Sequence, residues 1–499
     1  MAEQKITIEQ AQENILACAT FTAQNIKSLS GHAAAMKEIV PRYLEKPDVD
    51  LAAEFANSVD DPFTRDRLLM LVAEKCAALD DDEYGFQLVE AIEDEGTRAQ
   101  ARERIAVQKS AKGEFAKALE IAETLSHPDY VFGEIAVRQF ETNDDAGVLQ
   151  TIEKIDFPSA KATALQNIAL LNLKNGDNSK ASGFLKQAVD AANEIEFIEE
   201  RVRTLINIGN HFIEANQKDK AIETFDLAKN NSETIDGVHR DSFLASIALG
   251  FLQAGSLELA DRTLDLIADK TQMSATLIGF AREFWNAGEC GDALETLEEA
   301  YQILKSQRDN EIRDSRQRFN LWGTIAVEFA RMEKDERAVE TAQEIIDEDS
   351  QTFALAQIAQ ICAMQNQDEI ARQAINAIQD DAQRMFALIG VSDQKNKLEK
   401  PEEALRFLRE AETFAETVPQ LASRSAAFNE LAKRFYAYGD ADKARELLHE
   451  NLETIFQIRD ESSRVVALAR LADFYDELKI DLTEVERELL RAIVRKIEW

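Results

Sequence analysis

A pair of residues, one large and apolar and the next one small, recurs along most of this chain at intervals of 30 to 45 residues. Another large apolar residue usually stands three residues before the apolar member, and in many copies a further one stands three residues after the small member. This spacing places all of these side chains on one face of a helix. The pattern therefore predicts a protein made of repeated helices. The pairs are Val72-Ala73, Ile105-Ala106, Ile135-Ala136, Ile168-Ala169, Ile208-Gly209, Ile247-Ala248, Phe280-Ala281, Ile325-Ala326, Ile358-Ala359, Leu431-Ala432 and Leu471-Ala472, with a weaker copy at Val391-Ser392.

A second alanine follows most pairs, twelve residues after the small member, and begins another apolar stripe. Small residues at both places allow two helix backbones to cross closely, so each repeat reads as a helical hairpin. A hairpin cannot cover its own apolar face, so neighbouring hairpins must stack. In several copies a glycine stands five residues before the second alanine, where it tolerates the left-handed conformation that ends a helix. These glycines are Gly113, Gly176, Gly255, Gly288 and Gly439, and the second alanines are Ala118, Ala181, Ala221, Ala260, Ala293, Ala338, Ala371, Ala404 and Ala444.

Residues 161–193 hold the clearest copy, with Ala169, Gly176-Asp177, Ala181, Leu185 and Ala188 in order. This arrangement resembles the tetratricopeptide repeat. The resemblance implies an all-α fold, a right-handed α-solenoid of about twelve stacked hairpins of 30–45 residues, with a groove lined mainly by the first helices. The chain departs from the family because the closing proline is mostly missing and several units exceed the usual length of about 34 residues.

The organisation expected along the chain follows from where the repeats begin and end. Residues 1–60 are expected to form capping helices, over 6–30 and 32–45, ahead of tetratricopeptide-like repeats at 61–391 and 404–478. The segment 392–403 contains Pro401 and accompanies the weakest pair, so a hinge is expected there. Residues 479–499 are expected to form a C-terminal capping helix, with a partner-binding helix as the alternative.

The chain is strongly acidic, with 57 basic against 93 acidic residues and a net charge of −36. Phosphate backbones would be repelled, so nucleic acid is not expected as a partner. The acids are expected to solvate the outer helix faces, and a groove for a basic partner is the sharper alternative. No run of consecutive apolar residues is long enough to span a membrane. The four cysteines lie far apart in the sequence, and Cys76 and Cys362 fall on apolar faces, which favours core positions and a reducing, cytoplasmic location.

A basic residue stands seven positions before the apolar member of most pairs. From the start of the first helix it is expected to reach acids on the neighbouring hairpin, giving a ladder of exposed ion pairs worth roughly 0–1 kcal/mol each. These residues are Arg65, Arg98, Lys161, Arg201, Arg240, Arg318, Arg384, Arg424 and Arg464.

The positions that should face the groove supply the candidate binding residues. Arg282, Trp285 and Asn286 form the favoured cluster, because a tryptophan beside arginine and asparagine is typical of binding hot spots. Packing of Trp285 into the adjacent repeat is the structural alternative. The family's best-known site clamps a peptide carboxylate with lysine and asparagine. Asn210 matches that asparagine, but Ile206 stands in place of the lysine. The other candidates are Asn210, Arg203, Asn320, Gln360 and Lys433.

No pattern of catalytic or metal-binding residues accompanies these candidates. The five histidines are isolated, and phosphate-binding and nucleophile motifs are absent from the sequence. The run from Asp80 to Glu83 lies at a hairpin turn, where an aspartate N-cap explains it. We therefore expect no enzyme, no cofactor and no metal site. The expected function is a scaffold or adaptor that binds a peptide or protein. The alternatives are a regulatory sensor of a small ligand and, below it, an enzyme on an α/α scaffold.

Overall fold

The computed structural model describes residues 6–235, 237–306 and 315–498. These residues form 28 α-helices and no strand, which confirms the predicted all-α solenoid class. The chain divides into two compact units, Met1–Gln108 with Ile378–Trp499 (unit 1) and Lys109–Ala377 (unit 2). The helix α7 (Glu95–Ala111) crosses the boundary at residue 108. Each unit is described by itself.

The helices follow one another along the chain as hairpins. In unit 1 they are α1 (Ile8–Glu13), α2 (Ile15–Gln24), α3 (Leu29–Glu45), α4 (Val49–Asn57), α5 (Pro62–Ala78), α6 (Asp82–Ala91), α7, α23 (Asp381–Lys397), α24 (Pro401–Ala415), α25 (Leu421–Ala437), α26 (Ala441–Gln457), α27 (Glu461–Leu478) and α28 (Glu484–Glu498). In unit 2 they are α8 (Phe115–Ala122), α9 (Asp129–Glu141), α10 (Asp145–Glu153), α11 (Pro158–Lys174), α12 (Asn178–Asn193), α13 (Ile198–Glu214), α14 (Lys218–Ser232), α15 (Val238–Gln253), α16 (Leu257–Leu264), α17 (Lys270–Asn286), α18 (Cys290–Ser306), α19 (Ser315–Arg331), α20 (Asp335–Gln343), α21 (Glu348–Met364) and α22 (Asp368–Ala377).

The hairpin of α11 and α12 shows how the repeated pattern folds. Ala169 on α11 and Ala181 and Ala188 on α12 are fully buried, as the close crossing of two helices requires. Between the helices, Gly176 donates its N–H to the Leu173 carbonyl (3.0 Å) and Asp177 donates its N–H to Asn172 (2.9 Å), which satisfies carbonyls at the helix end. The Asp177 side chain then accepts from Lys180 N–H and begins α12.

The left-handed turn residue recurs in hairpins that have no glycine. Five turns use the predicted glycines, with φ from 77 to 93°. Six others place an aspartate, asparagine or glutamate in the same conformation. They are Asp80 (φ 65°), Asn143 (61°), Asn216 (57°), Glu333 (57°), Asn366 (61°) and Glu399 (58°). The turn geometry is therefore set by the hairpin and not by the glycine.

Glycine at such a turn is expected to stabilise the protein. Glu333→Gly should raise the free energy of unfolding by about 0.5–1 kcal/mol. The substitution relieves the strain of a left-handed glutamate, and this gain is larger than the entropic cost of ordering a glycine on folding. Glu340→Gly, inside α20 of the same hairpin, removes the same charge and should instead lower stability by about 1 kcal/mol. Urea unfolding of both variants checks the prediction. Destabilisation by both would show that the turn is not strained.

Five of the regularly spaced basic residues do not form the predicted ladder of ion pairs. Instead, each donates to the backbone carbonyl six residues earlier, just beyond the end of the preceding second helix. For Arg201 the distances from Nε and Nη2 to the Ile195 oxygen are 2.8 and 2.6 Å. Helix ends leave carbonyls without intrahelical partners, so a guanidinium there is favoured. The five pairs are Arg98–Ile92, Arg201–Ile195, Arg384–Ile378, Arg424–Val418 and Arg464–Ile458, whereas Arg65 does reach Glu93 (2.8 Å).

The N-terminal segment also differs from its prediction. The expected single helix over residues 6–30 is two helices, because Asn14 adopts an extended conformation and caps α2 through its side chain. The helix α3 continues through Pro41 to Glu45. The segment 392–403 contains the end of α23, a turn and the start of α24, and the hinge there stays a prediction.

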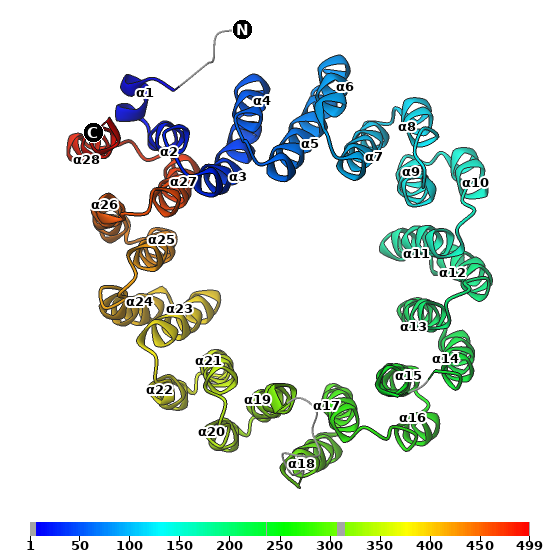
Figure 1. The fold of residues 1–499 in the computed structure, drawn as a ribbon. Helices are drawn as coiled ribbons and strands as arrows, with labels where there is room; N and C mark the ends of the chain where they lie inside the picture. Colours follow the sequence, from blue (N-terminus) through cyan, green and yellow to red (C-terminus); the bar gives the residue numbers. More distant parts are fainter. Residues whose placement is uncertain (1–5, 236, 307–314, 499) are drawn as a thin grey trace. The chain divides into compact units, whose positions relative to one another are not determined.

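The two ends of the chain pack together within unit 1. Helices α2 and α3 lie against α27, and α1 and α2 lie against α28 (Figure 1). Arg42 forms a two-pronged ion pair with Asp473, with distances of 2.8 and 2.7 Å, and Lys46 pairs with Asp476 (2.7 Å). The N-terminal helices therefore cover the last repeat as well as contacting α5.

Candidate functional site

Unit 2 consists of two rows of helices. The first helices of successive hairpins, from α9 to α21, contact one another in order, whereas the second helices lie along the other side of the row. The row bends with the first helices on its inner side (Figure 1). The second helices cover one side of each first helix, so the opposite side of the first helices is the surface that stays open.

Exposed and half-buried residues run along that open side at helical spacing. On α13 and α21 they recur at i, i+4, i+7 and i+11, which keeps them on one face of each helix. We call this set the first-helix stripe. It comprises Arg203, Asn207, Asn210 and Glu214 on α13, Arg282, Trp285 and Asn286 on α17, Asn320, Thr324 and Arg331 on α19, and Phe353, Gln357, Gln360 and Met364 on α21.

The structure places seven of the eight predicted binding residues on this stripe. Lys433 is the exception, because it lies on α25 in unit 1 and pairs with Glu477 (3.2 Å). The seven occupy four different first helices, so they form a row and not one cluster. Asn320 is already engaged, since its Oδ1 accepts from Ser350 Oγ (3.0 Å).

The favoured cluster on α17 has one member tied to the neighbouring repeat. Arg282 Nη2 lies 2.8 Å from Glu328 Oε1 on α19, and Arg331 Nη1 lies 2.6 Å from the same oxygen. The Glu328 side chain is only 2% exposed, so the two guanidinium groups neutralise a buried carboxylate. Trp285 is half-buried and Asn286 is exposed. The role of Arg282 is therefore partly structural, whereas Trp285 and Asn286 stay accessible.

On α21, sequence reasoning predicted Gln360 but missed the apolar members of the stripe. Phe353 is 66% exposed and Met364 is also exposed, on the face that carries Gln357 and Gln360. The sequence did contain a signal, because Phe353 and Met364 share a second face of the helix, away from the face that carries the buried pair Ile358-Ala359. The sequence alone does not show which of the two faces is exposed, because both faces of the helix carry apolar residues.

No protein-family model matches this chain, and no curated protein is similar to it in sequence. Solved structures with similar helical arrangements include the yeast protein Tom70 (14% identity, 91% of this chain and 98% of that one, TM-score 0.27). Others are Ton1535 from Thermococcus onnurineus NA1 (16%, 73% and 97%, 0.25) and a kinesin light chain from Podospora anserina with nearly identical TPR-like repeats (15%, 45% and 100%, 0.25). With TM-scores this low, the function of these proteins does not transfer. The description of the fold therefore rests on the hairpins themselves.

The helical hairpins of this chain resemble tetratricopeptide repeats. Its hairpins bury small residues where the helices cross, and each first helix packs on the first helix of the next hairpin. The resemblance predicted from Ala169, Gly176-Asp177, Ala181 and Ala188 is confirmed by the α11–α12 hairpin.

Four of the first helices of unit 2 contain few acidic residues, whereas α9 and α13 have three each and α21 has two. Helix α11 has no aspartate or glutamate, and α15, α17 and α19 have one each. Two of these three, Asp241 and Glu328, are buried. The second helix α18 alone has four acids. The net charge of −36 is therefore carried mainly outside the first-helix stripe.

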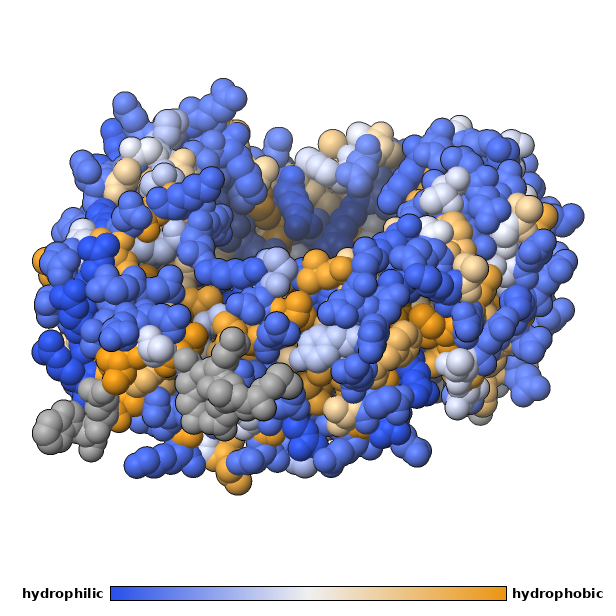
Figure 2. Space-filling model, turned by 90° about the horizontal axis from the view of Figure 1, so that it is seen from above, coloured by the Kyte–Doolittle hydropathy of each residue, from blue (hydrophilic) through white to orange (hydrophobic). Residues whose placement is uncertain are grey.

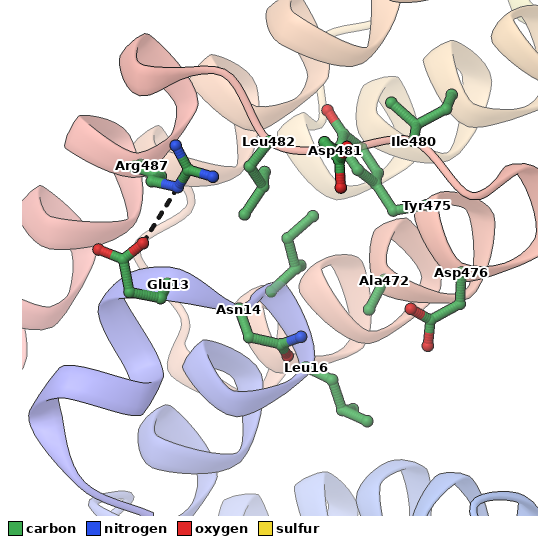
Figure 3. Close-up of a pocket in the computed structure, with 11 residues that line it drawn as sticks. Glu13, Asn14, Leu16, Ala472, Tyr475, Asp476, Ile480, Asp481, Leu482 and Arg487 are labelled. Atoms are coloured by element: carbon green, nitrogen blue, oxygen red, sulfur yellow. Dashed lines mark ion pairs between the residues drawn. The ribbon is translucent and has the colours of Figure 1, made fainter.

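Unit 1 holds a pocket of about 220 Å³ where its two chain ends meet. Figure 3 shows Glu13, Asn14 and Leu16 on one side, with Tyr475 and Arg487 from the C-terminal end opposite. The charged groups there serve to join the ends, because Glu13 pairs with Arg487 (3.0 Å) and with Arg491 (3.1 Å). We interpret this pocket as a seam between the terminal helices.

Other chemistry is sparse in the described ranges. They contain no cluster of residues that could hold a metal ion, and none of their helices has the length and apolar character to cross a membrane. The face drawn in Figure 2 is largely hydrophilic, with apolar residues between polar ones. Burial raises the pKa of the Cys18, Cys76 and Cys362 thiols to about 12, so these thiols are unreactive core groups. The predicted core positions of Cys76 and Cys362 are confirmed.

Proposed function

We propose that this protein is a non-enzymatic scaffold whose first-helix stripe binds a segment of a protein partner. One observation carries the proposal: Asn207 and Asn210 on α13, and Gln357 and Gln360 on α21, form no side-chain hydrogen bond with any described residue and are not fully buried. A carboxamide offers both donors and an acceptor, so a row of them suits the backbone of a bound peptide.

Apolar anchors accompany these amides. Phe353 and Met364 flank Gln357 and Gln360 on α21, and Trp285 stands beside Asn286 on α17. Aromatic anchors surrounded by polar groups are typical of binding hot spots. The partner segment that fits such a surface carries apolar side chains and little charge. The stripe itself, being poor in acids, gives no reason for a basic segment at this place.

A small-ligand sensor is the second candidate. A pocket of about 330 Å³ lies between α9, α10 and α12, lined by Phe140, Leu149 and Phe184 among others. The two phenylalanine rings pack edge to face with centroids 6.2 Å apart. A ligand there should raise the melting temperature of the whole protein. We also propose a reducing, cytoplasmic location, because all four cysteines are unpaired.

Removal of the anchors should weaken partner binding while leaving the fold intact. A co-purifying partner is first identified by mass spectrometry after affinity capture at low and high salt. Trp285→Ala and Phe353→Ala are each expected to weaken its binding about thirtyfold, which corresponds to the loss of about 2 kcal/mol that is typical of hot-spot residues. Glu295→Ala on α18, an exposed residue of the same hairpin as Trp285, is the matched control and should bind normally. Equal binding by all four proteins would remove the stripe from consideration.

A further inference from the structure

Exposed aromatic rings stand at the beginnings of three successive first helices of unit 2. Tyr130 lies in the first turn of α9. Phe157 and Phe197 occupy the positions just before the first residues of α11 and α13. They are 55%, 42% and 69% exposed, respectively. We call these rings, with Asp156 and Glu200, the edge patch. Apolar surface residues mark an interaction site when they are contiguous and bordered by polar groups.

The position of Phe157 is fixed by the preceding repeat. Asp129 Oδ1 accepts from the backbone N–H groups of Asp156 (2.7 Å) and Phe157 (2.9 Å), which holds the linker against the start of α9. The rings of Tyr130 and Phe157 consequently pack edge to face, with centroids 6.1 Å apart and an angle of 70° between their planes. The pair is therefore a rigid, preformed surface.

Glu200 connects this pair to the third ring. Glu200 lies in the first turn of α13, which packs on α11, the helix that begins after Phe157. Burial and, after it, the charge of Glu200 raise the pKa of Tyr130. Glu200 also follows Phe197 by three residues in the first turn of α13, which places both on one side of the helix. The edge patch therefore runs across the starts of α9, α11 and α13.

The charge of the edge patch is negative and unneutralised. Neither Asp156 nor Glu200 forms an ion pair with any described residue. Arg201 follows Glu200, but its guanidinium is held on the Ile195 carbonyl and on Asn231 Oδ1 (3.2 Å). Lys161, one turn beyond Phe157, forms no ion pair with these acids.

We infer that the edge patch binds an arginine-bearing segment of a basic protein partner. Aromatic faces attract a guanidinium group, which stacks on them better than an ammonium does, and the adjacent carboxylates can accept its N–H groups. Exposed rings beside free carboxylates complement such a side chain in both shape and charge. The basic partner that the net charge suggests would, on this inference, bind at the edge patch. The inference does not depend on whether the first-helix stripe binds anything.

The test measures binding of fluorescent acetyl-tetraarginine-amide by anisotropy. Phe157→Leu with Phe197→Leu keeps the apolar area but removes two rings, and should weaken binding about fivefold or more, since each exposed cation–π contact contributes about 0.5–1 kcal/mol. Phe197→Leu alone, at the most exposed ring, should show about half of that free-energy loss and has least risk of disturbing the fold.

The control separates a specific site from general attraction to an acidic protein. Asp156→Asn with Glu200→Gln should weaken binding several-fold, whereas Glu295→Gln with Glu299→Gln, which removes the same charge from exposed positions on α18, should change it less than twofold. Equal losses in both charge variants, with none in the leucine variants, would overturn the inference. A concentration-dependent dimer in sedimentation that Phe197→Leu abolishes would also overturn it, because a second copy would then be the occupant.

Discussion

Phe225→Ala is expected to lower the free energy of unfolding of unit 2 by about 3–5 kcal/mol. Phe225, on α14, is fully buried and packs edge to face on Phe251 with centroids 5.8 Å apart. Its ring fills the space left by two glycines, Gly209 on α13 and Gly250 on α15. Removing the ring leaves a cavity at the junction of two repeats. The loss is measured by urea unfolding. Hydrogen exchange identifies the unfolding step that exposes the amides of α13, α14 and α15.

The glycines provide a decisive check of this packing. A Cβ added at Gly209 would lie 2.5 Å from Phe225 Cε1, so Gly209→Ala alone should cost about 1–3 kcal/mol. In the Phe225→Ala background the same change should be neutral or stabilising, because the added methyl enters the cavity. Additive losses in the double variant would mean that Phe225 and Gly209 are not in contact.

Glu486→Ala is the second substitution with a large expected effect, about 3–5 kcal/mol. The Glu486 side chain is 1% exposed and accepts from Tyr475 Oη (2.9 Å), Arg445 Nη2 (2.8 Å) and Thr483 N–H (2.7 Å). It thereby fastens α28 to α26 and α27. Burial and then the charge of Glu486 raise the pKa of Tyr475. Without the carboxylate, Arg445 loses its ionic partner and keeps only the Asp481 carbonyl (2.7 Å), and the Tyr475 hydroxyl loses its acceptor.

A neighbouring glutamate separates this effect from loss of charge. Glu488 is exposed on the same helix and pairs with Arg491 (2.7 Å). Glu488→Ala should change the free energy of unfolding by less than about 1 kcal/mol, as surface ion pairs usually do. Hydrogen exchange of α27 and α28 amides reports both variants. Similar small effects would show that the Glu486 network is not coupled to the stability of unit 1.

The hairpins could be predicted because their determinants are local and repeated. Ala169 and Ala181 are only twelve residues apart, and the same spacing recurs through the chain. The left-handed turns were predicted only where glycine marked them, because glutamate (Glu333) does not favour this conformation and asparagine (Asn216) favours it less than glycine does.

Contacts between distant residues could not be predicted in the same way. Arg42 and Asp473, 431 residues apart, give no sequence signal that they pair within unit 1. The regular spacing of the arginines is visible in the sequence. Their acceptor, the carbonyl six residues earlier, is not, because every residue has a carbonyl. The candidate site was found in part, since Trp285 and Gln360 follow from the repeat position. Phe353 did not, because its exposure depends on how α21 packs.

The most direct test of the central claim is photocrosslinking from the first-helix stripe. A photoreactive phenylalanine analogue is placed at position 285 on α17, at 353 on α21 and, as the control, at 295 on α18, in protein expressed in its native cell. The account predicts that one protein is captured from positions 285 and 353 but not from 295, and that excess unlabelled protein competes for it. Capture from 295 as strongly as from the stripe, or no capture at 285 and 353, would contradict the claim that the first helices of unit 2 hold the partner.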